Sequence, residues 1–426
     1  MSHDARTPPL ALGSHDSPAA HGVGWRLAGI VVTHSVIDFF SFVIVPILTV
    51  LEGRLTLTPG QGAILLAAGS LSSGLIQPLV ALFGDKHDTR WLGTLGFIAA
   101  VMAISCTGFV NSFTQLLLIQ IIGAAGVGAF HPPGAAVMGH LSGRRRSLGV
   151  SVFYAAGMIG GIAGNTITPV YVKHFSLEAL AWLTIPGLCA AVVLALAVRG
   201  VTHRHHGARD AHLALDAGLR RARWNAVWLL YAANILRFTV NMALVQLVIR
   251  WTEHAALART GGETLDTATR TLASTINGPL QAAMQVGMGV AGLAFGALIR
   301  PKGEKVVLIV VPALGAVCIA AFPYLANEQG RGVLPFFLTV LGGIGYAGVA
   351  PITISLAQRL LPHRTSLASA LMMGGAWAWA AGGPPLAQAF MGWFGLSGAF
   401  VATGALLLVA SLLALPLPTK LITESK

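Results

Sequence analysis

Two charged residues stand inside long apolar stretches of this sequence, where an ionised side chain is costly to keep. Asp38 lies near the middle of residues 25–51, and Arg237 lies near the middle of residues 224–251. A buried carboxylate can take up and release a proton, and a buried guanidinium can attract an anion. We therefore predict that Asp38 couples proton movement and that Arg237 binds a solute. The alternative is a static ion pair joining the two stretches, although a pair that breaks during a working cycle would serve both roles.

Two histidines extend this polar set. His34 lies one helical turn before Asp38, so the two side chains share a helix face, and we predict that His34 passes the coupling proton. An imidazole changes charge near neutral pH, which suits a proton relay or a hydrogen bond to a substrate. His131 is therefore predicted to contact the solute. Alternatively, it hydrogen-bonds the carbonyl groups that the following Pro132-Pro133 pair leaves free.

Other polar side chains inside apolar stretches are predicted to line the solute path, with bridging between helices as the alternative. Asn234 and Asn241 stand three residues before and four residues after Arg237, so the three share one helix face. This cluster is the second candidate for the site. Further contacts to the solute are predicted from three residues in other stretches: Tyr154, Asn165 and Tyr346.

The apolar stretches themselves indicate a helical membrane protein. The chain has 426 residues, of which 55% are hydrophobic and only 10% are charged, whereas soluble domains carry about 25% charged residues. Blocks of about 20 apolar residues cross a bilayer as helices, and a β-barrel would show short alternating segments instead. We predict an all-α membrane protein with twelve transmembrane helices, at residues 25–51, 59–83, 90–110, 113–140, 148–172, 177–197, 224–251, 272–299, 305–325, 333–360, 366–393 and 396–417.

The formal net charge of +12 is distributed as in an inner-membrane protein and not as in a nucleic-acid-binding protein. With the N-terminus inside, 20 of the 27 Lys and Arg residues fall in cytoplasmic segments, 6 fall in outer loops, and Arg237 lies within a span. Positive charge concentrates on the cytoplasmic side of membrane proteins. We therefore predict a multi-pass protein of the cell inner (plasma) membrane, with the lipid bilayer as its partner and both termini in the cytoplasm.

An internal repeat divides the chain into two halves. Pro132 matches Pro351 at an offset of 219 residues, and near the start of each half an offset of 199 pairs Asp38 with Arg237. The difference of 20 fits a long external loop at Glu253–Thr271. Parallel repeats of six helices are typical of one large transporter architecture. The predicted organisation is a disordered cytoplasmic tail (1–24), a six-helix bundle (25–199), a cytoplasmic linker (200–223), a second six-helix bundle (224–417) and a cytoplasmic tail (418–426).

Two smaller patterns concern helix ends and helix packing. A charged turn with Gly84, Asp85 and Lys86, followed by Arg90, comes after the second predicted span. It is either an ordinary cytoplasmic turn or a specific contact, for which Asp85 is the distinguishing residue. Small residues at three- and four-residue spacing let helices approach closely, and the fifth span carries such a series: Gly157, Gly160, Gly161 and Gly164.

These motifs resemble the major facilitator superfamily, and within it the fosmidomycin-resistance group of bacterial permeases. The resemblance is carried by Thr33-His34 with Asp38, Gln77-Pro78 before Gly84-Asp85-Lys86, Gly128-Ala129-Phe130-His131-Pro132, Ser151-Val152-Phe153 with the glycines after it, and Ala357-Gln358 with Leu361-Pro362-His363-Arg364. It implies two six-helix bundles, a cavity lined by the first helix of each half, and a conformational latch at the turn from Gly84 to Arg90. Two features depart from the family. The second half has no clear aspartate at the equivalent turn, where Arg300 or Glu304 stands, and residues 253–271 form a longer loop.

Transport is the function that this combination favours. The resemblance implies alternating access and efflux of a small drug-like compound, which is the activity of an antiporter in antibiotic resistance. Asp38 favours proton coupling, and Arg237 favours an anionic solute. A metabolite uptake permease, a channel and a substrate-sensing membrane receptor are the alternatives. The chain has no H-E-x-x-H, G-x-S-x-G or P-loop motif, so we predict that it is not an enzyme and has no cofactor or metal site. We also predict a functional monomer without a nucleic-acid partner.

Overall fold

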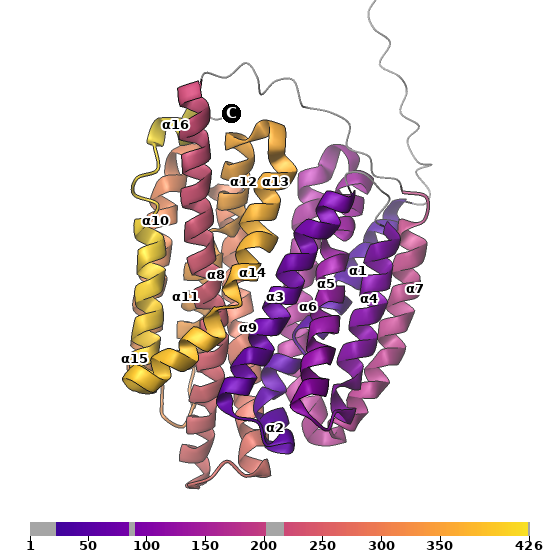
Figure 1. Ribbon diagram of the computed structural model, residues 1–426, viewed down its shortest axis with the longest axis vertical. Helices are drawn as coiled ribbons and strands as arrows, with labels where there is room; N and C mark the ends of the chain where they lie inside the picture. Colours follow the sequence, from indigo (N-terminus) through magenta and orange to yellow (C-terminus); the bar gives the residue numbers. More distant parts are fainter. Residues whose placement is uncertain (1–22, 85–89, 202–216, 425–426) are drawn as a thin grey trace, which may run out of the picture.

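The structure is a computed structural model that describes residues 23–84, 90–201 and 217–424. The described chain is built from helices (Figure 1). The first half contains α1 (Val23–Ser41), α2 (Ile44–Leu55), α3 (Pro59–Gly84), α4 (Arg90–Ser105), α5 (Phe113–Leu141), α6 (Arg146–Phe175) and α7 (Thr184–Val198). The second half contains α8 (Ala217–Thr260), α9 (Thr267–Leu298), α10 (Pro301–Leu325), α11 (Leu334–Ala347), α12 (Ala350–Leu360), α13 (Thr365–Ala370), α14 (Ala376–Ala380), α15 (Gly383–Leu412) and α16 (Thr419–Glu424).

The prediction of twelve membrane-crossing segments is confirmed. Within the described residues, 11 helices are long and apolar enough to cross a membrane, and a shorter apolar helix covers Leu367–Ala380. α15 accounts for two segments, because Gly395 adopts φ 70° and ψ 176° and the chain turns back there. This turn is visible at the foot of the yellow helix in Figure 1. The part of α15 before Gly395 completes the eleventh predicted span, and the part after it forms the twelfth.

Proline explains the breaks in the first and the tenth span. Pro46 has no N–H to donate to the carbonyl of Phe42, and the first span breaks into α1 and α2 at Phe42 and Val43. Pro351 likewise leaves the carbonyl of Ala347 without a donor, and the tenth span breaks into α11 and α12. Each break frees backbone polar groups inside a span, which a membrane protein tolerates where protein surrounds them.

The helices form two bundles that stand side by side. α1 packs on α6, and α3 and α4 pack on α5, in the first bundle, whereas α15 packs on α8 and α10, and α11 on α9, in the second. Contact between the bundles is made by α9 against α6 and α2, and by α3 against α14 and α15. We call the end where α7 finishes and α8 begins the linker end, and the opposite end, where α2 finishes and α9 begins, the far end (Figure 1).

The prediction of a long external loop at residues 253–271 is wrong. α8 continues to Thr260 and α9 begins at Thr267, so the connection itself covers only residues 261–266. The helix continues because Ala255 and Ala256 are buried against the bundle, which extends the packed face beyond the apolar stretch. Asp266 ends the connection as the N-cap of α9, where its carboxylate accepts a hydrogen bond of 2.7 Å from the Thr269 amide.

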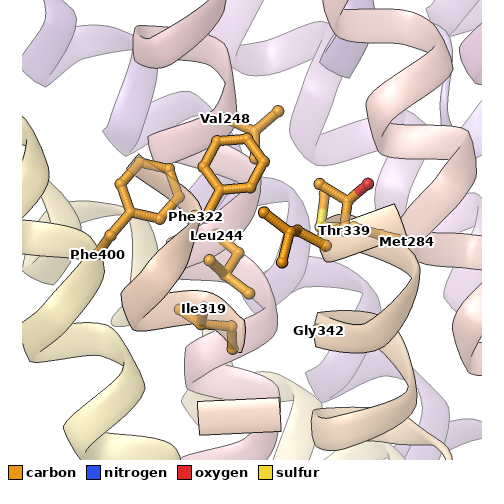
Figure 2. A pocket seen from close by; sticks show the side chains of 9 residues that line it. Leu244, Val248, Met284, Ile319, Phe322, Thr339, Gly342 and Phe400 are labelled. Atoms are coloured by element: carbon orange, nitrogen blue, oxygen red, sulfur yellow. The ribbon is translucent and has the colours of Figure 1, made fainter. Parts of the chain in front are cut away.

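The second bundle encloses a small apolar cavity of about 10 Å³ (Figure 2). Figure 2 shows the rings of Phe322 and Phe400 beside Leu244 and Ile319 at this cavity. Its one polar side chain, Thr339, donates its hydroxyl to carbonyls of its own helix, including that of Pro335 at 3.0 Å. A cavity of this size and lining is a dry packing void and is too small to hold a solute.

Candidate functional site

Asp38 occupies the centre of a polar cluster between α1 and α5. Its carboxylate Oδ2 lies 3.4 Å from His34 Nε2 on the same helix, and its Oδ1 lies 3.3 Å from His131 Nε2 on α5. The i, i+4 spacing of His34 and Asp38 puts both on one face, as predicted, and the packing of α5 on α1 adds His131. Asp38 and His34 are buried, whereas the His131 side chain keeps 26% of its surface exposed.

The backbone fixes the orientation of both imidazoles. His34 Nδ1 lies 2.6 Å from the carbonyl oxygen of Phe153, and His131 Nδ1 lies 2.8 Å from that of Val127. A carbonyl oxygen only accepts, so each Nδ1 carries a hydrogen. In a neutral imidazole the Nε2 atom then presents a lone pair, and both Nε2 atoms face the Asp38 carboxylate. Lone pairs facing a carboxylate repel it, so the cluster is favourable only when a proton or another cation lies among them.

The structure does not support the alternative role of His131, in which its ring hydrogen-bonds the carbonyls freed by Pro132 and Pro133. Pro132 and Pro133 leave the carbonyls of Gly128 and Ala129 without amide donors. His131 Nδ1 instead contacts Val127 O, in the turn before them. The imidazole therefore does not serve the carbonyls that the proline pair frees.

Aromatic rings and a glycine shape the space around Asp38. The His34 ring stacks on Phe153, with ring centroids 3.7 Å apart and an interplanar angle of 21°. Tyr154 of α6 lies near enough to Asp38 for the two side chains to interact electrostatically. Tyr346 of α11 likewise lies near enough to interact with Tyr154. Because α6 belongs to the first bundle and α11 to the second, this series of polar side chains crosses the interface.

Gly157 of α6 leaves room beside the cluster. A Cβ at this position would lie 2.8 Å from His34 Nε2 and would also meet Asp38 Oδ2, which is closer than real side-chain contacts. Two further glycines of the predicted series, Gly160 and Gly164, face the backbone carbonyls of Ser35 and Phe39 on α1. The glycine series therefore brings α6 against α1, as the spacing indicates, and also keeps space free at Asp38.

Arg237 lies elsewhere, inside the second bundle. Its Nη1 donates a 2.9 Å hydrogen bond to Asn234 Oδ1, and its Nη2 lies 3.5 Å from the carbonyl of Leu308 on α10. Asn234 in turn donates to Thr353 Oγ1 at 3.0 Å and to the carbonyl of Met372 at 3.1 Å. Arg237 is 1% exposed, and its Nε has no hydrogen-bond partner in the described chain.

The structure therefore does not bring Arg237 to Asp38. The offset of 199 places the two residues at equivalent points of their helices, but it does not set the rotation of α8 relative to α1. α8 turns Arg237 toward α10 and α12 and not toward the interface between the bundles. Asn241, predicted to share this face, contacts Met288 Sδ on α9 at 3.5 Å. Arg237 and Asn234 thus form one buried group, separate from the Asp38 cluster.

Asn165 lies where α6 meets α9. Its Nδ2 donates to the carbonyl of Gly161 at 3.0 Å, and its Oδ1 is buried without a partner in the described residues. Gln285 of α9, next to Gly161, has a similarly buried and unpartnered Oε1. Two unused acceptors at the contact between the bundles are suited to groups that donate hydrogen bonds.

The far end holds an ionic network that the sequence did not reveal. Arg250 of α8 contacts Glu52 of α2 at 2.5 Å and Glu253 of its own helix at 2.9 Å. Thr49 donates a 2.6 Å hydrogen bond to Glu253, and Arg270 of α9 donates to the carbonyl of Thr49 at 3.1 Å. We name these five residues the far-end network. All but Arg270 are less than 9% exposed, so the two bundles are closed against each other there.

A weak sequence signal for this network existed. Glu52 and Arg250 each stand within four residues of a predicted span end, where they look like ordinary boundary charges. They are separated by 198 residues, and the repeat does not pair them. Only the packing of α2 against α8 and α9 identifies them as partners.

At the linker end, the predicted latch lies mostly outside the described residues. Gly84 ends α3 and Arg90 begins α4, whereas Asp85 and Lys86 are not among the residues that the structure describes. In the second half, Glu304 lies in the first turn of α10 and forms an ion pair with Arg359 of α12. This contact stays within one bundle, so Glu304 does not join the two halves.

Among the described residues, twelve membrane-crossing segments in two bundles, with a polar cluster near their interface, define a polytopic helical membrane protein. The chain belongs to the Major Facilitator Superfamily, whose defining pattern matches residues 30–382. Members of this family are transporters.

Two bacterial proteins are similar in sequence to parts of this chain. The fosmidomycin resistance protein of Escherichia coli (strain K12) is 26% identical over 205 residues, which are 48% of this chain and 50% of that protein. The uncharacterized MFS-type transporter YfnC of Bacillus subtilis (strain 168) is 25% identical over 163 residues, 38% of this chain and 40% of that protein. The chain thus spans about half the length of the curated relatives it matches.

Solved structures share the fold over nearly the whole chain. A bacterial homologue of the human lysosomal transporter Spinster, in an inward-facing and unoccupied conformation, gives a TM-score of 0.69 at 16% identity, covering 96% of this chain and 99% of that one. Its inward-facing and occupied form gives 0.68 at 15% identity, covering 93% and 97%. At these identities the likeness concerns the fold.

Proposed function

We propose that this protein is a secondary active transporter that exports a small solute across the inner membrane by alternating access. The observation that carries the proposal is the buried cluster of Asp38, His34 and His131, next to an interface that the far-end network closes. A charged cluster at this depth is costly unless it binds something. The partial likeness to a fosmidomycin resistance protein supports export and a role in drug resistance.

Coupling to the proton gradient is the second part of the proposal. The Nε2 lone pairs of His34 and His131 face the Asp38 carboxylate, so a cation between them stabilises the cluster. The gradient across the inner membrane supplies protons for this role. Asp38 and His34 take the coupling role, and the partly exposed His131 faces the solute. An anionic solute is favoured because the guanidinium of Arg237 is buried and contacts only neutral groups among the described residues.

The charge distribution supports the orientation. With the linker end in the cytoplasm, both termini lie inside, and the closed far end faces outward. The turn from Gly84 to Arg90 then lies at the cytoplasmic face, where we propose that Asp85 stabilises the outward-open state by bridging the halves. Asp85→Asn should slow transport and shift the distribution of states with little loss of folding. Unchanged transport with unchanged cytoplasmic accessibility would leave only an ordinary turn.

The proposal is tested with purified protein in proteoliposomes and radiolabelled fosmidomycin as the first probe. Saturable counterflow is expected of a carrier, whereas a channel or a receptor gives none. An imposed pH step should drive uphill accumulation in the wild type but not in Asp38→Asn, which should still bind the probe. The matched control is Glu178→Gln, which removes an exposed carboxylate paired with Arg54.

Three outcomes separate the alternatives. Uphill transport that survives in Asp38→Asn places the coupling elsewhere. Accumulation that follows the gradient inward in cells identifies an uptake permease. Failure of fosmidomycin to bind directs a thermal-shift screen to other phosphonates, organic acids and antibiotics.

A further inference from the structure

We propose that His34, Asp38 and His131 form a binding site for a divalent transition-metal ion such as Zn²⁺. One ligand atom from each residue lies within 4.8 Å of the others, from two histidines and a carboxylate on two helices. Zinc sites that bind water or a substrate commonly have three protein ligands of these types and an open fourth position. The inference goes beyond transport, because binding of a metal ion can be measured whether or not a solute moves.

The interatomic distances are the first argument. Charge-assisted N–H···O bonds are typically about 2.7–2.9 Å long, whereas the two contacts of the Asp38 carboxylate with the imidazoles measure 3.3 and 3.4 Å. A tetrahedral ion with bonds of about 2.0–2.1 Å holds its ligand atoms about 3.3 Å apart. Each imidazole nitrogen therefore lies at the distance of a coordination-shell edge from one carboxylate oxygen, His34 from Oδ2 and His131 from Oδ1, and not at that of a direct hydrogen bond.

The orientation of the imidazoles is the second argument. Metal-bound histidines usually donate their other ring N–H to a backbone carbonyl or a carboxylate, which aims the free lone pair at the ion. His34 does so to Phe153 O, and His131 does so to Val127 O. His34 Nε2 is also buried and has no hydrogen-bond partner in the described chain. Both Nε2 atoms are thus held ready as ligands.

Space and access complete the site. Gly157 lacks the Cβ that would otherwise press on His34 Nε2 and Asp38 Oδ2. The His131 side chain is 26% exposed, so an ion can reach the cluster from that side. Two neutral imidazoles and one carboxylate leave a bound divalent ion with one net positive charge. Its open position would therefore accept water or an anionic group.

The experiment measures metal binding to the purified full-length protein in nanodiscs at fixed pH, with any purification tag removed. All proteins carry alanine at the histidines outside the described residues, namely His3, His15, His21, His87, His203, His205, His206 and His212. Isothermal titration with Zn²⁺ should give one site per chain. Mg²⁺ should give none, because imidazole ligands select transition metals. Co²⁺ should give the intense visible absorption of a four-coordinate site.

The variants make the result specific to these ligands. Loss of a ligand should cost more than the roughly 10–100-fold that loss of a supporting hydrogen bond costs, so His131→Ala should weaken Zn²⁺ binding by about 100-fold or more. His131→Cys supplies a thiolate and should restore binding, which a merely misfolded site would not do. Gly157→Ala keeps all three ligands and should weaken binding by crowding them. His254→Ala, at an exposed histidine, is the control and should change nothing.

Two results would overturn the inference: Zn²⁺ binding by the wild type that is no tighter than by His131→Ala, or a cobalt spectrum of a six-coordinate aqueous ion. Fosmidomycin counterflow is measured on the same preparations. Metal binding without counterflow would reject fosmidomycin as the solute and leave the metal site standing. Counterflow without metal binding would reject the metal site and leave the transport proposal standing.

Discussion

The far-end network offers the most direct test of how the two bundles are held together. Glu52→Gln keeps the size of the side chain and removes its charge, so Arg250 loses its partner in the other bundle. Glu253, 2.9 Å away on the same helix, still partners Arg250 in the variant. The substitution should therefore destabilise the closed far end specifically, without leaving the guanidinium unpaired.

The magnitude follows from the burial of the pair. Removing one partner of a buried hydrogen-bonded ion pair costs about 2–5 kcal/mol, and the lower end applies because Glu253 remains. When the far end opens, both side chains become solvated and the substitution costs little. The free-energy difference between the closed and open states therefore changes by about 2 kcal/mol, which shifts the equilibrium roughly 30-fold toward the open far end.

Distance measurements between two spin labels by electron paramagnetic resonance can detect this shift. Spin labels at Lys173→Cys and Thr264→Cys lie on exposed far-end positions of the two bundles, in a background without the native cysteines. The distribution of distances should move to longer values in Glu52→Gln. The control Glu178→Gln breaks an exposed pair within the first bundle and should leave the distribution unchanged. An unchanged distribution in a folded Glu52→Gln protein, or an equal shift in the control, would refute the reasoning.

Three further predictions concern orientation, the second bundle and helix packing. A cysteine at Thr264 should react with an impermeant reagent added to intact cells, whereas one at Arg204 in the linker should not; labelling at Arg204 would overturn the orientation. Arg237→Met removes a buried charge that has no carboxylate partner among the described residues, so the melting temperature should stay equal or rise while transport is lost; a clear fall in melting temperature would assign Arg237 a structural role. Gly160→Ala puts a Cβ against the carbonyl of Ser35 and should lower the melting temperature by several degrees, and wild-type stability would show that α1 and α6 can separate freely.

Much of the fold could be predicted from the sequence. Apolar blocks near 20 residues long are required of any helix that crosses a bilayer, so all twelve segments were recognisable before any contact was known. The turn at Gly395 lies between the predicted spans 366–393 and 396–417, as expected. The breaks after Ser41 and Ala347 lie near proline inside predicted spans, and their positions were not predicted. Where a helix continues past the apolar block, as α8 does to Thr260, composition marks the wrong end because packing and not the bilayer stabilises the extension.

The site divides in the same way. The sequence by itself determined that His34 and Asp38 share a face, because four residues make about one turn of a helix whatever surrounds it. Only the tertiary structure decided that His131, from another helix, completes this cluster while Arg237 does not, and that Glu52 meets Arg250 across 198 residues. These pairings depend on how each helix is rotated about its axis and which neighbour it packs against. A span that is apolar nearly all round carries almost no periodic signal of that rotation, so it is fixed only when the helices pack.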